Sequence, residues 1–274
     1  MTGLATAGKR PKKAKKWAKR KNILVIAATS AAILILAVAY MLSLANNIEN
    51  GNEAQAVLID QLSMTNPNKP FYWTTQTLLN QFNMQVWYKE GTFNTVDFFR
   101  DLPRYNFKII ILRVHSAVNP ETGNLAIFTG EKWSDSSAQW DYLTDIMNGR
   151  IAKVRVEENS TAYFGITQAF IPSMNGDFKG ALIIMMGCEG LTNEKMAKAF
   201  IEKGAKAYIS WTGPVSSEHT DAATLNLLQH LLVDRKTVGE SVTATNYEIG
   251  RDPDYGSELV WYPLDEEDYV VDIP

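Results

Sequence analysis

Cys188 is the only thiol in this chain of 274 residues, which also contains three histidines. It follows an apolar run at 181–186 and stands within the sequence Gly-Cys-Glu-Gly. His115 directly follows a second apolar run, 107–114, with the sequence FKIIILRV. A thiol beside an imidazole can act as a nucleophile, because an isolated thiol is only slightly ionised at neutral pH and needs a base.

Two neighbouring parallel strands would bring Cys188 and His115 together, because such strands lie about 4.8 Å apart and end at the same edge of the sheet. The N–H of Cys188 and those of neighbouring residues could then stabilise an oxyanion. Gly187 and Gly190 permit a tight turn and a close approach by a substrate. The alternative is structural: a lone thiol can be a small buried side chain, and a histidine after a strand can be an ordinary loop residue.

Alternating apolar runs and helical patterns predict an α/β domain whose mostly parallel, doubly wound sheet carries its sites at the carboxyl ends of the strands. The pattern lapses at 119–179, which we interpret as an insertion with hairpins at 125–133 and 151–171 around a helix at 137–147. The strands are expected at 56–62, 84–88, 107–114, 181–186 and 205–211, with an edge strand at 257–264, and the helices at 74–82, 95–102, 194–203, 221–233 and 238–246.

Several motifs span nearly all of the outer domain: VLIDQLS (57–63), IIILRVHSA (109–117), MMGCEGL (185–191), AFIEKGAKAYISWTG (199–213) and HTDAAT (219–224). In their order they resemble the caspase-like cysteine peptidases, and most closely the gingipain-like branch and related archaeal membrane-anchored proteins. The resemblance implies a three-layer α/β/α fold. It also implies an endopeptidase in which Cys188 is the nucleophile and His115 the general base or acid, and in which the N–H groups of Ser116 and Cys188 form the oxyanion hole.

Ser116 departs from the family pattern, which usually has glycine after the histidine. Serine keeps the N–H but lacks the conformational freedom of glycine. A catalytically inactive surface domain that acts in binding or as a scaffold is therefore the alternative function.

Members of the superfamily that cleave after basic residues line their pocket with an acidic side chain. By resemblance, Asp60 at the end of the first strand would attract Lys or Arg, with Asp221 as a second candidate and Trp211 as an apolar wall. These residues also have structural interpretations, because an aspartate after a strand commonly caps a turn and a tryptophan is commonly core.

The N-terminus has the pattern of a membrane anchor. Residues 1–22 carry nine Lys and Arg and no acid, and 23–45 carry no charge, which is long enough for a transmembrane helix. The basic cluster predicts a cytoplasmic N-terminus, a stalk at 46–55 and an outer domain at 56–274. We interpret that cluster as a signal for topology and anionic lipid, not nucleic acid. A signal peptide cleaved near Ala45 is the alternative.

The expected partners are therefore the membrane and protein or peptide substrates at its surface. No cofactor is expected, since no His or Cys pair has the spacing of zinc ligands and no phosphate-binding glycine motif occurs. A weak structural calcium site could use the C-terminal acids, although the spacing of an EF-hand is absent. These acids are Asp252, Asp254, Glu266, Glu267 and Asp268.

Overall fold

The computed structural model describes residues 55–271. The predicted basic segment, transmembrane helix and nearly all of the stalk lie outside these residues. Within 55–271, no helix combines the length and the apolar composition that a bilayer span requires.

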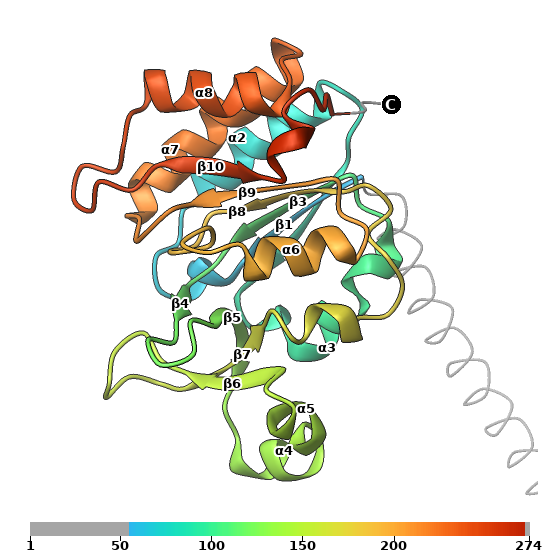
Figure 1. Cartoon of the computed structure of the whole chain (residues 1–274), viewed down its shortest axis with the longest axis vertical. Helices are drawn as coiled ribbons and strands as arrows, with labels where there is room; N and C mark the ends of the chain where they lie inside the picture. Colours follow the sequence, from blue (N-terminus) through green and yellow to red (C-terminus); the bar gives the residue numbers. More distant parts are fainter. Residues whose placement is uncertain (1–54, 272–274) are drawn as a thin grey trace, which may run out of the picture. The chain divides into compact units, whose positions relative to one another are not determined.

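Sheet A forms the centre of the domain and has six strands in the order β10-β9-β8-β3-β1-β2 (Figure 1). All neighbouring pairs are parallel except the edge pair of β10 and β9. The predicted mixed α/β domain with a mostly parallel sheet is thus confirmed. The strands are β1 (Ala56–Asp60), β2 (Val86–Glu90), β3 (Ile109–Arg113), β8 (Leu182–Met185), β9 (Ala207–Trp211) and β10 (Leu259–Tyr262).

Helices cover both faces of sheet A (Figure 1). On one face lie α2 (Lys69–Asn80), α7 (Ser217–Leu228) and α8 (Val238–Glu248), and on the other lie α3 (Val96–Asp101) and α6 (Lys195–Glu202). Strands covered on both faces need apolar side chains at successive positions, which explains the continuous apolar runs in the sequence.

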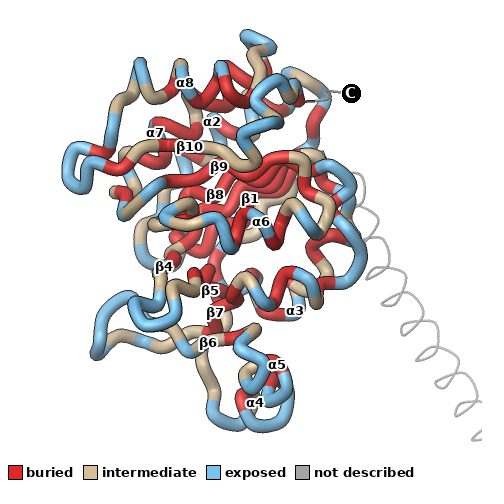
Figure 2. The backbone as a smooth tube through the Cα atoms, in the orientation of Figure 1, coloured by how far each residue is buried: buried red, intermediate tan, exposed pale blue. Residues whose placement is uncertain are grey.

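Side chains of sheet A alternate between two hydrophobic clusters, one on each face of the sheet. Those on the α2, α7 and α8 face include Leu58, Ile111 and Ile184. Their neighbours along the strands, such as Ile59 and Leu112, belong to the cluster on the α3 and α6 face. Figure 2 shows the central strands almost wholly in the buried colour.

A second, antiparallel sheet, sheet B, has the strand order β4-β5-β7-β6. The predicted hairpin at 151–171 is present as β6 and β7, but 125–132 is one strand and not a hairpin; it pairs with β4 and with β7. Sheet B also begins before 119, since its first strand directly follows His115. The predicted helix at 137–147 is two short helices. These elements are β4 (Ser116–Val118), β5 (Leu125–Lys132), α4 (Asp135–Trp140), α5 (Leu143–Met147), β6 (Ile151–Val154) and β7 (Tyr163–Thr167).

Two elements beside the carboxyl edge of sheet A differ from the sequence prediction. A 3-10 helix, Gln61–Met64, replaces the end of the first predicted strand. Helix α7 begins at Ser217 and continues into a π-helix, Gln229–Val233, so Asp221 lies inside the helix and not at its start. Further 3-10 helices span Gly91–Phe93, Leu102–Tyr105, Ile171–Ser173 and Leu264–Glu266.

Candidate active site

Strands β3 and β8 are neighbours in sheet A, and their register relates the two residues that the sequence singled out. The ladder runs from Ile109 opposite Leu182 to Leu112 opposite Met185. The same offset, continued beyond the ladder, places His115 opposite Cys188. Both residues therefore lie just beyond the carboxyl ends of neighbouring parallel strands, which are about 4.8 Å apart where they pair.

His115 is held at three of its polar groups. Its ring Nε2 lies 3.0 Å from the Thr65 hydroxyl. Its backbone N–H donates to Gln61 Oε1 at 2.9 Å, and its carbonyl accepts from the Phe128 N–H at 2.9 Å. Burial lowers the pKa of His115, and the positive charge of Arg113 lowers it further. The imidazole is therefore neutral at pH 7 and can accept a proton.

Cys188 is half-buried, and its thiol contacts the loop that follows β9. The Sγ atom donates to the Val215 carbonyl at 3.6 Å and accepts from the Val215 N–H at 3.5 Å. Burial raises the pKa of Cys188, and the charge of Glu189 adds to this, although the Val215 backbone opposes it. No hydrogen bond joins the thiol to the ring of His115 in the described part of the chain. The directions of the two pKa shifts make both groups neutral at pH 7.

The N–H of Ser116 points away from the neighbouring strand β5. In an antiparallel pair, alternate residues bond to the partner strand. Phe128 donates to the carbonyl of His115, and Asn119 donates to that of Asn124, so the odd-numbered residues of this strand bond to β5. The N–H of Ser116 is directed to the free edge of sheet B.

Ser116 also contacts residues 187–190, which we call the cysteine turn. Its hydroxyl donates to the carbonyl of Cys188 at 2.6 Å. The N–H of Cys188 donates to no other residue between 55 and 271. A Cβ atom on Gly187 would meet the Ser116 hydroxyl and lie 2.8 Å from the carbonyl of Val114. A side chain at position 187 would therefore collide with the protein itself, and this packing requires glycine. The sequence had instead suggested that glycine leaves room for a substrate.

Asp60 and Asp221, the candidates for binding a basic substrate residue, lie on either side of Arg113. The guanidinium donates through Nη1 to Asp60 at 2.8 Å, and through Nε and Nη2 to Asp221 at 2.7 and 2.8 Å. The Tyr88 hydroxyl donates to the other oxygen of Asp60 at 2.9 Å, and Asn68 is a second donor to Asp221 Oδ2 at 2.8 Å. The arginine side chain has 0% exposure.

Neither carboxylate is therefore open to a substrate cation in this structure, because a cation of the chain itself occupies both. The pKa of Arg113 is raised, since the hydrogen bonds and charges of the two aspartates outweigh the effect of burial. Sequence reasoning missed this partner, yet a signal was present. An arginine within a buried apolar strand needs compensating acids.

Trp211 is a core residue. It is 1% exposed at the end of β9, and its indole N–H donates to the Thr220 hydroxyl at 2.9 Å. Its ring lies 5.3 Å from that of His219. The structure places it under α7, not on the wall of an open pocket.

The C-terminal acids do not gather around a common point. Asp252 is buried and accepts from the N–H and hydroxyl of Ser216, both at 2.8 Å, and from the N–H groups of Asp254 and Tyr255, both at 2.9 Å. It thus anchors the loop that contacts the thiol. Among residues 55–271, no group of three His, Cys, Asp or Glu side chains could hold a metal ion.

The chain matches no protein-family model and no curated protein. Its functional assignment therefore depends on its own residues and their geometry. The resemblance to caspase-like cysteine peptidases stays a hypothesis drawn from the sequence motifs.

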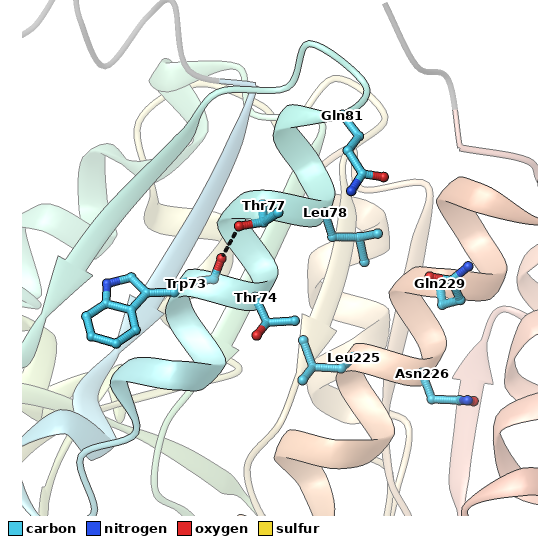
Figure 3. A pocket seen from close by; sticks show the side chains of 8 residues that line it. All are labelled: Trp73, Thr74, Thr77, Leu78, Gln81, Leu225, Asn226 and Gln229. Atoms are coloured by element: carbon cyan, nitrogen blue, oxygen red, sulfur yellow. Dashed lines mark hydrogen bonds between the residues drawn. The ribbon is translucent and has the colours of Figure 1, made fainter.

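A groove of about 530 Å³ lies between α2 and α7, away from the candidate pair (Figure 3). None of its lining side chains is ionisable at neutral pH, so it offers no acid or base for catalysis. The lining residues are Trp73, Thr74, Thr77, Leu78, Gln81, Leu225, Asn226 and Gln229.

Proposed function

We propose that the outer domain is a cysteine endopeptidase of the caspase-like superfamily, with Cys188 as nucleophile and His115 as its base. The observation that supports this proposal is the pairing of β3 with β8, since His115 and Cys188 follow the carboxyl ends of these neighbouring strands and the offset of the ladder, extended by three residues, relates one to the other. The resemblance of the surrounding motifs adds to it, since they occur in the order of the family.

In the proposed reaction, the neutral His115 takes the proton of the Cys188 thiol as sulfur attacks the peptide carbonyl. The N–H groups of Cys188 and Ser116 stabilise the resulting oxyanion. His115 then gives its proton to the leaving amine, and the thioester remains. His115 next removes a proton from water, which hydrolyses the thioester and releases the thiol. The neutral state of both groups at rest suits this general-base route.

The proposed substrates are proteins or peptides at the extracytoplasmic surface of the membrane. In this proposal residues 23–45 anchor the domain there, and the N-terminus lies in the cytoplasm. A preference for cleavage after Lys or Arg comes from the resemblance. Residues 23–274 hold 18 basic against 30 acidic side chains, and this charge also favours basic substrates at long range. Asp60 and Asp221 supply that preference only if a substrate displaces Arg113 from them.

A catalytically inactive binding domain is the second candidate, and one observation favours it. The thiol is engaged by the backbone of Val215, and burial raises the pKa of Cys188. A thiol in that state is a poor nucleophile until the loop moves.

The test uses the full chain in detergent micelles, with wild type, His115→Ala and Cys188→Ala compared. A peptidyl acyloxymethyl ketone ending in Arg labels cysteine peptidases at the nucleophile, so we expect labelling of Cys188 that depends on His115. A matched probe ending in Leu measures the preference for basic residues. Labelling that ignores the His115 change, together with no hydrolysis of peptide substrates, would leave the inactive binding domain.

A further inference from the structure

Glu189, the residue after the thiol, has an uncommon backbone conformation. Its φ angle is +62°, a left-handed backbone conformation that residues other than glycine adopt at a cost of about 1–3 kcal/mol. Its backbone N–H donates to the Gly213 carbonyl at 2.8 Å. Its carboxylate accepts from the backbone N–H of Val118 at 2.8 Å. One residue thus joins the cysteine turn to the loop after β9 and to strand β4.

The contact with β4 is made on the edge that carries the candidate oxyanion donor. Val118 and Ser116 are two residues apart on this strand, so their N–H groups point to the same side, away from β5. The Ser116 hydroxyl also donates to the carbonyl of Cys188. Strand β4 is therefore fixed to the cysteine turn at two points, through the Ser116 hydroxyl and the Val118 N–H.

We propose that Glu189 is a positioning residue, whose carboxylate holds β4 through Val118 so that the Ser116 N–H and the Cys188 N–H converge on the oxyanion. This inference rests on the proposed function. It gives a role to a carboxylate at a position where glycine would relieve the backbone. It also assigns to Glu189 an effect on the transition state, not on substrate binding.

The competing interpretation makes Glu189 an inhibitory contact. The carboxylate occupies an N–H of an edge strand, a group to which the backbone carbonyl of a peptide could otherwise bind. The two interpretations give opposite results. Loss of a positioning contact lowers kcat, whereas loss of an inhibitory contact lowers KM and raises activity.

Three substitutions separate the hydrogen bond from the charge and from the backbone strain. Glu189→Gln keeps an oxygen acceptor for Val118 and loses the charge. Glu189→Ala loses both, and Glu189→Gly loses both while relieving the left-handed backbone. Glu121→Ala, an exposed acid in the β4–β5 connection, is the matched control for charge.

We expect kcat to fall by about 10- to 100-fold in Glu189→Ala and Glu189→Gly, somewhat less than the loss of a whole oxyanion donor. KM should stay within about threefold, and Glu189→Gln should retain most of kcat, because it rescues the acceptor. The pH midpoint of Cys188 alkylation should fall in all three Glu189 variants, since each removes a charge that raises the pKa of the thiol. Glu121→Ala, the control, should change neither kcat nor the pH midpoint of Cys188 alkylation.

Wild-type kcat in both the alanine and the glycine variants would overturn this inference and leave the peptidase proposal intact. A lower KM with higher activity would replace positioning by inhibition. An equal loss of kcat in Glu189→Gln and Glu189→Ala would show that charge, not the hydrogen bond, is needed, and would also overturn it. Absence of hydrolysis by the wild type, with labelling independent of His115, would overturn both proposals together.

Discussion

Two polar clusters lie at the carboxyl edge of sheet A, and they differ in how completely their hydrogen bonds are satisfied. The arginine cluster consists of Arg113, Asp60 and Asp221, and donors from the protein reach both carboxylates on each oxygen. The thiol pair consists of Cys188 and His115. Its members are half-buried, and each side chain has a single hydrogen-bonding partner residue. This partner is Thr65 for His115 and Val215 for Cys188.

The difference shows that a polar residue at the end of a strand can have either of two roles, a structural one or a role in binding and catalysis. Every carboxylate oxygen of the arginine cluster accepts a hydrogen bond from within the fold, so the cluster contributes to structure and has no open acceptor for a ligand. The thiol pair keeps unused capacity at the ring, the sulfur and the nearby N–H groups. Activity and stability should therefore respond separately to changes in the two clusters.

Cys188→Ala should have the largest effect, on activity alone. Without the nucleophile, peptide hydrolysis should fall by at least about 1,000-fold. The free energy of unfolding should stay within about 1 kcal/mol, because the side chain is half-buried and small. Turnover of a fluorogenic peptide and urea unfolding followed by tryptophan fluorescence measure the two quantities. Retained turnover would place the nucleophile elsewhere.

Arg113→Met should lower the free energy of unfolding by about 3–5 kcal/mol, because it leaves two buried carboxylates without a counter-charge. Burial raises the pKa of Asp60 and Arg113 opposes this, so the variant should raise it further. A carboxyl group with a raised folded pKa favours the folded state when protonated, and that stabilisation is lost as pH rises.

The deficit of Arg113→Met against wild type should therefore be smaller at pH 5 than at pH 7 in urea unfolding. The triple variant with Asp60→Asn and Asp221→Asn as well should recover much of the loss, since no charge is then left buried. An equal deficit at both pH values would mean that the two aspartates are not the source of the instability.

Gly187→Ala tests whether the cysteine turn can change its conformation to make room for a side chain. The new methyl would press on Ser116 and on the Val114 carbonyl, so we expect a loss of about 1–3 kcal/mol in stability and a lower kcat. Gly213→Ala is the control, because the nearest atom to its methyl is Ser257 Cβ at 3.4 Å. Similar thermal unfolding temperatures for the two variants would show that the turn yields easily.

Thr65→Val should have the smallest effect. It removes the hydroxyl beside His115 Nε2, and one hydrogen bond contributes about 0.5–1.5 kcal/mol, or about 2- to 12-fold in kcat/KM. Thr65→Ser should retain wild-type kcat/KM because it keeps the hydroxyl. If the serine variant were as impaired as valine, the methyl group and not the hydrogen bond would orient the ring.

The sequence predicted the layers of the fold because buried parallel strands require continuous apolar runs, as in 107–114 and 181–186. It also predicted that His115 and Cys188 end strands, and the register then related them. Strand β4 was out of its reach, because three residues are too few to show an apolar pattern. The engagement of Asp60 and Asp221 by Arg113 was missed, although an arginine in a predicted buried strand was a signal for it.

One connection in the fold couples the candidate base to both sheets. Strand β3 of sheet A ends at Arg113 and strand β4 of sheet B begins at Ser116, so only Val114 and His115 lie between them. The backbone of His115 is bonded to Gln61 beside one sheet and to Phe128 in the other. The candidate base thus lies in the two-residue connection between the sheets, and the residues that carry the nucleophile are hydrogen-bonded to the same strand β4 through Ser116 and Val118. Because one short strand of sheet B is joined by the chain to His115 and by hydrogen bonds to Cys188 and Glu189, a displacement of that strand would reach the candidate base and the candidate nucleophile together.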